Sequence, residues 1–118
     1  MTTLTQGIQP YEWLLSDEEN RSRDVETVTV AGAVALPSGT VLGRITATGK
    51  LIKQVDAAAD GSQVAVGVLG NPLAGVNGDY KAVVLTRAAE VIGVKLNGGA
   101  GPSTTAKAAL KALGVVVR

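Results

Sequence analysis

The sequence predicts a small single-domain protein that is mainly β, with one short helix near its C-terminus. Three observations support this fold class. The chain has 118 residues, which is enough for one hydrophobic core but not for two. From Val25 onward, short valine-rich segments alternate with period two and are separated by glycine-containing turns. After Ser103, apolar residues recur instead at helical spacing.

The first strand is expected at Val25–Val30, where apolar and polar side chains alternate. Turn signals at 36–39, 60–61 and 77–78 separate it from the later segments. Further strands are expected at 40–46, 51–55, 63–69, 80–86, 90–92 and 115–117. In the segment 63–69, Val64, Val66 and Val68 should share one face. The small residues Ala65 and Gly67 would leave the other face open to close packing.

The expected helix follows the glycine-rich loop at 97–102. Ser103 or Thr104 can cap its N-terminus, and Gly114 ends it. Its apolar stripe consists of Ala106, Ala109, Leu110 and Leu113. Lys107 and Lys111 fall outside this stripe, which indicates that the helix packs one face on the core.

The first 24 residues differ from the rest of the chain. We divide the sequence into an arm, residues 1–24, which is charged and lacks a strand pattern, and a compact body, residues 25–118. The arm contains the apolar cluster 11–15, followed by the acidic run 17–19. It is either a frayed terminus or a flexible segment that orders on a partner. The second interpretation is favoured because a frayed end rarely needs a tryptophan, although Trp13 could also cover the core of its own subunit.

Composition excludes several function classes. A net charge of +1 and three aromatic residues do not fit a partner that is a nucleic acid or an anionic membrane. No apolar run approaches the ~20 residues of a membrane span, and the N-terminus does not have the pattern of a signal peptide. The chain has no cysteine, which excludes disulfides and thiolate metal sites. Because it also has no Phe, its core should be thin, which favours burial between subunits.

No constellation of residues points to catalysis, and we predict no enzyme activity and no catalytic, cofactor-binding or metal-ligating residues. The segment 43–51 is similar to a phosphate-binding loop, but its glycine spacing is one residue too long and Leu51 cannot bind Mg²⁺. Asp56 and Asp60 flank a turn and lack the spacing of a calcium loop or of a glycosidase pair. The chain has no histidine to activate its hydroxyl groups.

Segments along nearly the whole chain resemble the lambda-type phage head decoration family. The resemblance lies in their order, since none of them is chemically diagnostic. The matching segments are 11–16, 20–24, 28–30, 36–43, 46–50, 60–62, 66–69, 84–91 and 112–118.

The resemblance implies a β-clip-like fold that assembles as a homotrimer. It also implies a structural protein of the virion, made in the bacterial host cytoplasm, that has no cofactor. The trimers would bind the outer surface of an expanded tailed-phage capsid at local three-fold sites. There they would hold the major capsid protein subunits together against internal DNA pressure.

The family's N-terminal arm is mobile in the free protein and pairs with strands of the shell protein. We therefore expect the capsid contacts of this chain to come from Ile8, Tyr11, Trp13, Leu14 and Leu15. Pairing of an extended segment with a sheet edge is a common recognition mode. The alternative function is a small ligand-binding or glycan-binding β module, which an open pocket around Tyr80 would favour.

Overall fold

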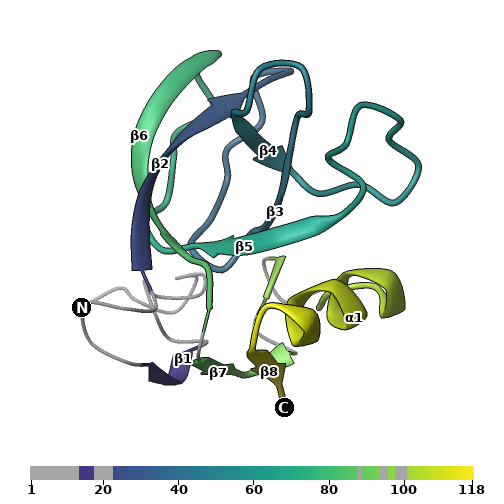
Figure 1. The fold of residues 1–118 in the computed structure, drawn as a ribbon. Helices are drawn as coiled ribbons and strands as arrows, with labels where there is room; N and C mark the ends of the chain where they lie inside the picture. Colours follow the sequence, from purple (N-terminus) through teal and green to yellow (C-terminus); the bar gives the residue numbers. More distant parts are fainter. Residues whose placement is uncertain (1–13, 18–22, 88, 94–95, 98–100) are drawn as a thin grey trace, which may run out of the picture.

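The computed structural model describes residues 14–17, 23–87, 89–93, 96–97 and 101–118. In chain order the elements are β1 (Leu14–Asp17), β2 (Arg23–Val30), β3 (Val41–Arg44), β4 (Leu51–Lys53), β5 (Ala65–Leu69), β6 (Gly78–Leu85), β7 (Ala89–Val91), α1 (Thr104–Ala112) and β8 (Val115–Val117). The described residues are thus mainly β with a short helix near the C-terminus (Figure 1). This confirms the predicted fold class.

Strands β2, β4, β3, β5 and β6 close into a barrel in that order. The longest ladder is the antiparallel pair β2–β6, which runs from Arg23↔Leu85 to Val30↔Gly78. The barrel closes between β2 and β4, which are parallel and pair at Val28↔Leu51. Sequence periodicity carries no information about a parallel closure of this kind, and we did not predict it.

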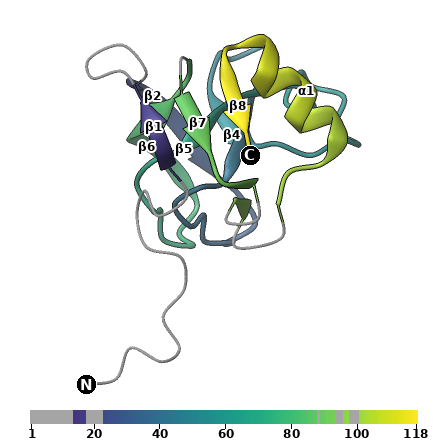
Figure 2. The same ribbon diagram turned by 90° about the horizontal axis from the view of Figure 1, so that it is seen from below.

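A three-stranded sheet in the order β1-β7-β8 lies at one end of the barrel, and α1 lies beside it (Figure 1). The strands follow one another across the sheet when the molecule is seen from below (Figure 2). Strand β7 pairs antiparallel with β1 and parallel with β8. In the part of the chain that the structure describes, no helix has the length and apolar character of a membrane span.

The core consists of two clusters, one on each side of the barrel wall. The first joins the barrel to α1 and the three-stranded sheet, and the second is formed by barrel strands and the loop before β3. The first contains Val41, Ala65, Val68, Leu85, Ala89, Val91, Leu96, Ala106, Leu110 and Val115. The second contains Val28, Val30, Leu36, Leu42, Leu51, Leu69, Ala82 and Val84. Each cluster is built from Leu, Val and Ala, as the composition requires.

The predicted helix is confirmed in detail. The Ser103 hydroxyl accepts a hydrogen bond from the Ala106 N–H at 3.1 Å, which caps the N-terminus. Ala106 and Leu110 are buried, and Ala109 packs against the first cluster. The other end of the predicted stripe, Leu113, is 37% exposed, because it follows the last helical residue as the C-cap.

The expected strands are also present, and β3, β4 and β5 are two or three residues shorter than predicted. One detail of β5 was wrong. Val66 and Val68 do not share a face, because Val68 belongs to the first cluster and Val66 packs against the second. The cause is a bulge: Leu42 pairs with Gly67, whereas the next residue, Gly43, pairs with Ala65. The extra residue in β5 turns the following side chains to the opposite face.

The close packing expected at Gly67 is present. A Cβ atom placed there would lie 2.6 Å from Cγ1 of Val84 and 2.9 Å from the Leu85 carbonyl oxygen. Strand β6 therefore approaches β5 at a distance that only glycine permits. A packing requirement thus explains why this residue interrupts an otherwise valine-rich strand.

The expectation that residues 1–24 contain no strand was wrong at two places. Leu14–Asp17 forms β1, and β2 begins at Arg23, two residues before the expected start of the body. Strand β1 forms because β7 offers it an edge, with Leu14 opposite Val91 and Asp17 opposite Ala89. A strand that depends on a partner about 75 residues away in sequence leaves little local signal.

Candidate functional site

The structure describes part of the predicted contact set. Ile8, Tyr11 and Trp13 lie outside the described residues. Leu14 and Leu15 begin β1 at the edge of the three-stranded sheet. The Leu14 side chain is partly buried and packs against the first core cluster. Leu14 therefore contacts its own subunit.

The start of β2 is fixed by a second group of contacts. The Thr86 hydroxyl donates to Oδ2 of Asp24 at 2.9 Å, and the Arg87 guanidinium forms an ion pair with the same carboxylate. These donors, the Arg87 hydrogen bond above all, lower the pKa of Asp24 below its ordinary value of 3.8. The contacts join the end of β6 to the first residues of β2.

A polar cavity of about 540 Å³ adjoins this ion pair. A second pair, Arg44–Glu26, with 3.4 Å between Nη2 and Oε2, also lies on its wall. Both acids in the cavity are thus paired with guanidinium groups. Such partly exposed pairs contribute only about 0–1 kcal/mol each to stability. The pocket is lined by Asp24, Glu26, Arg44, Val66, Thr86, Arg87 and Leu113.

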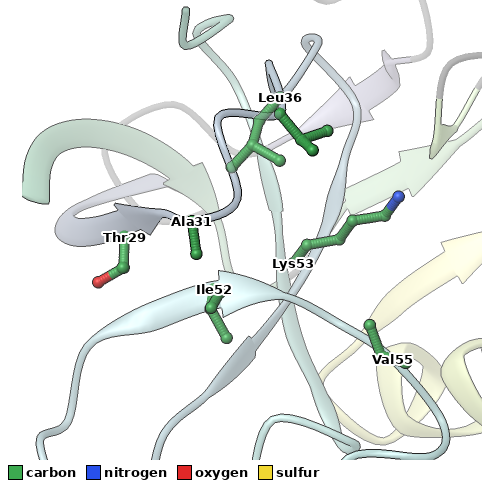
Figure 3. Close-up of a pocket in the computed structure, with 7 residues that line it drawn as sticks. Thr29, Ala31, Leu36, Ile52, Lys53 and Val55 are labelled. Atoms are coloured by element: carbon green, nitrogen blue, oxygen red, sulfur yellow. The ribbon is translucent and has the colours of Figure 1, made fainter. Parts of the chain in front are cut away.

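A second cavity, of about 240 Å³, is apolar (Figure 3). It opens where β2 and β4 separate beyond the pair Val28↔Leu51, and Lys53 is the charged residue on its wall. The Lys53 ammonium group extends away from the backbone of β4 in the close-up (Figure 3). We call this cavity the groove. Its lining residues are Thr29, Ala31, Val34, Leu36, Ile52, Lys53 and Val55.

The segment similar to a phosphate-binding loop contains the turn that joins β3 to β4. Its Ile45 N–H donates to the Lys50 carbonyl at 2.8 Å, and Gly49 has a φ of +74°. Gly43 is required for a different reason, since a Cβ there would lie 2.1 Å from the Ser62 carbonyl oxygen. Both glycines thus serve the path of the backbone.

The candidate carboxylates of the body have structural partners. Asp60 accepts hydrogen bonds from the Ser62 hydroxyl and N–H, which lower its pKa. Asp56 accepts from Gln54 and from the hydroxyl of the helix cap Ser103. Among the described residues, no three acidic side chains converge on a point where a metal ion could bind.

Comparison with models of known protein families shows to which family the chain belongs. The family model of bacteriophage lambda head decoration protein D matches residues 3–116 of the 118 residues. The chain belongs to this head decoration family. The match spans the arm and the body alike, so it covers the described fold and the residues that precede β1. The comparison with individual curated proteins gave no match.

Membership in the head decoration family gives the chain a role in decorating a phage head, at the outer surface of the virion capsid. The family is structural and is not known for enzyme activity. A head decoration protein must attach to a large curved shell, so its functional site is an exposed surface rather than an enclosed pocket. Exposed apolar side chains on this head decoration protein are therefore the features to examine.

Sequence reasoning missed two features of the surface. The Asp24–Arg87–Thr86 contacts join residues more than 60 positions apart, and no local pattern predicts them. The exposed valines Val34 and Val76 were also missed. A signal for the valines existed: residues 27–43 and 61–78 contain no charged side chain.

Proposed function

We propose that the chain is a cement protein that binds the outside of an expanded tailed-phage capsid as a homotrimer at local three-fold sites. It stabilises the shell there against the pressure of packaged DNA. It is made in the cytoplasm of the bacterial host and contacts the major capsid protein. The observation that supports this proposal best is the family match over residues 3–116.

In this proposal the arm makes the primary contact. Ile8, Tyr11 and Trp13 precede β1, and they supply apolar surface that a strand edge or pocket of the shell protein can bury. Each fully buried large side chain contributes about 1.5–3 kcal/mol, against a backbone ordering cost of about 1–2 kcal/mol per residue. Three such segments on one trimer bind together, since the first contact raises the effective concentration of the other two.

The position of β1 refines the roles of Leu14 and Leu15. Leu14 packs on its own body, so we propose that it supports attachment by holding β1 in place rather than by contacting the shell. Leu15 remains a proposed contact. Strand β1 itself stays with the body when the shell is bound, because its ladder with β7 is formed within the chain.

The experiment is a truncation that removes residues 1–13 and keeps β1. Expanded, undecorated capsids are mixed with the full chain, with the truncated chain or with Trp13→Ala, and bound protein is measured after sedimentation. We expect the truncated chain to stay folded and to lose attachment, and Trp13→Ala to weaken attachment while leaving the melting temperature nearly unchanged. Full attachment of the truncated chain would contradict the proposed role of the arm.

No observation favours the alternative of a ligand-binding or glycan-binding module. The Tyr80 hydroxyl donates to the Val76 carbonyl oxygen at 2.8 Å, and its ring packs against the second core cluster. Tyr80 lines neither of the two cavities described above. An aromatic platform for a sugar would instead present its ring face to solvent.

A further inference from the structure

We propose that the barrel opens locally at the junction between β2 and β4, and that two ion pairs across this junction make its opening depend on ionic strength. We call this junction the seam. The β3–β4 hairpin, residues 41–53, forms one side of the seam, and the paired strands β2 and β6 form the other. The inference does not depend on the proposed function, because it concerns the barrel of a single chain.

The seam is the shortest ladder in the barrel. Within residues 23–87, all of which the structure describes, β2 and β4 pair at a single position, Val28↔Leu51. On its other side β2 pairs with β6 along the whole length of both strands, and β3 pairs with every residue of β4. The short β5–β6 ladder is extended by a hydrogen bond from the Gly70 N–H to the Val83 carbonyl oxygen at 2.8 Å. The seam therefore has the least backbone pairing to lose.

The two strands separate on one side of this single pair. Val30 pairs with β6 and Lys53 pairs with β3, so neither residue continues the seam. The groove lies between the diverging strands, and Thr29 of β2 and Ile52 of β4 both line it (Figure 3). Side chains that face a cavity lack packing partners on that side. Packing beside the seam thus adds little to its single backbone pair.

Two ion pairs join the hairpin to the strands across the seam. Arg44, the last residue of β3, pairs with Glu26 of β2, with 3.4 Å between Nη2 and Oε2. Its Nη1 also donates to the Gly49 carbonyl oxygen at 2.7 Å, which holds the guanidinium against the hairpin turn. Lys50, directly before β4, forms the second ion pair with Asp79 of β6. Separation of the seam breaks both pairs.

The Asp79 carboxylate is positioned to accept the ammonium group of Lys50. The Thr29 hydroxyl donates to Oδ1 of Asp79 at 2.7 Å, while Lys50 contacts Oδ2. The hydrogen bond from Lys50, followed by that from Thr29, lowers the pKa of Asp79 below its ordinary value of 3.8. Asp79 is therefore ionised at neutral pH, and its contact with Lys50 weakens when salt screens the two charges.

Pairs of this exposure are weak, but a local opening is sensitive to weak contacts. The four side chains are 26–42% exposed, and such a pair changes an equilibrium constant by up to about fivefold. This factor is small beside the equilibrium constant of global unfolding and large for a local opening of low free energy. The Debye length falls from about 10 Å at 0.1 M salt to about 3 Å at 1 M. Salt should therefore open the seam before it affects the rest of the fold.

The opening has a consequence for the edge of β2. While the seam is closed, β4 covers this edge at Val28. An open edge presents backbone donors and acceptors that can pair with a strand of another chain. The two ion pairs thus protect the barrel against pairing between copies.

The test follows hydrogen exchange of the Leu51 amide by NMR. Lys50 and Gln54 form backbone hydrogen bonds toward β3, so the alternation of the ladder directs the Leu51 N–H toward β2. Exchange is measured on the full chain at 0.1 M and 1 M NaCl. We expect Leu51 to exchange at least about tenfold faster than the most protected amides of the β2–β6 ladder. Its rate relative to theirs should rise roughly threefold or more at the higher salt concentration.

Neutral variants test whether the ion pairs are the cause. Asp79→Asn and Glu26→Gln each remove one charge of the seam and keep an oxygen acceptor. The matched control is Glu90→Gln, because the pair between Glu90 and Arg118 lies outside the barrel. At 0.1 M NaCl we expect each seam variant to speed exchange of Leu51 about two- to fivefold and to reduce its dependence on salt. The control should leave both unchanged.

Three results would overturn the inference. Exchange of Leu51 as slow as that of the most protected β2–β6 amides would mean that the seam opens only when the whole fold unfolds. A relative rate that does not change with salt would exclude control by ionic strength. Equal rates in the wild type and both seam variants, or the same acceleration in Glu90→Gln, would remove the role of the two ion pairs.

A reporter thiol covers the case in which the Leu51 amide exchanges too fast to follow. The chain has no cysteine, so Val28→Cys and Val68→Cys each carry a single thiol. Both valines are fully buried, Val28 in the second cluster at the seam and Val68 in the first cluster. We expect the Val28→Cys thiol to react with a neutral alkylating reagent at least about tenfold faster than the Val68→Cys thiol, and faster still at 1 M NaCl. Equal rates at both salt concentrations would contradict the inference.

Discussion

Replacement of Leu14 by alanine tests whether β1 belongs to the body. Leu14 is partly buried against the first core cluster, and its backbone pairs with Val91 of β7. Truncation of a fully buried leucine costs about 2–5 kcal/mol. For a side chain buried in part, we expect about half of this, roughly 1–2 kcal/mol. With an unfolding entropy of about 2.1 cal/mol/K per residue, this loss lowers the melting temperature by roughly 4–8 °C.

The assay is thermal unfolding followed by circular dichroism at one fixed protein concentration, because dissociation of subunits would otherwise shift the midpoint. Leu113→Ala is the matched control, since Leu113 is 37% exposed at the end of α1. We expect the control to change the midpoint by less than about 4 °C. An unchanged midpoint for Leu14→Ala would refute the packing of β1 on the body and return Leu14 to the set of direct capsid contacts.

Three further predictions concern the stability of the fold. Gly67→Ala should destabilise the fold by about 1–3 kcal/mol in urea unfolding, because its Cβ would lie 2.6 Å from Val84 Cγ1; a neutral effect would contradict the close approach of β5 and β6. Ser103→Ala should cost about 1 kcal/mol through loss of the helix cap, and Ser103→Asn should restore most of it. The lowered pKa of Asp24 stabilises the fold above its ordinary value of 3.8, and this contribution disappears as pH falls through the lowered pKa. Asp24→Asn should therefore lower the free energy of unfolding by less than about 1 kcal/mol at pH 7. Below pH ~4 its free energy of unfolding should fall less steeply with pH than that of the wild type. An equally steep fall in both proteins would argue against this ion pair.

Much of the fold could be predicted because its signals are local. The helix after Ser103 is specified by a capping side chain, a 3.6-residue stripe and Gly114, all within a dozen residues. The strands from Val25 onward follow from period-two alternation between turn residues. These features do not depend on distant contacts, so sequence reasoning finds them.

The features that were missed all depend on contacts distant in sequence. Strand β1 exists because β7 offers it an edge, and the face switch at Val66 follows from the register of β5 against β3. The pair Val28↔Leu51 that closes the barrel joins parallel strands, whose pairing leaves no turn signal between them. The bridge between Leu36 and Leu73 likewise joins two loops about 40 residues apart.

Saturation binding to expanded, undecorated capsids tests the central claim most directly. Purified protein is titrated onto the shells, and the bound copies per shell are counted from the mass of the complexes. The proposed function predicts saturation at three copies per local three-fold site, together with shells that withstand heating or chelation that disrupts bare ones. Absence of binding at micromolar concentration, or binding that adds no resistance to the shell, would contradict it.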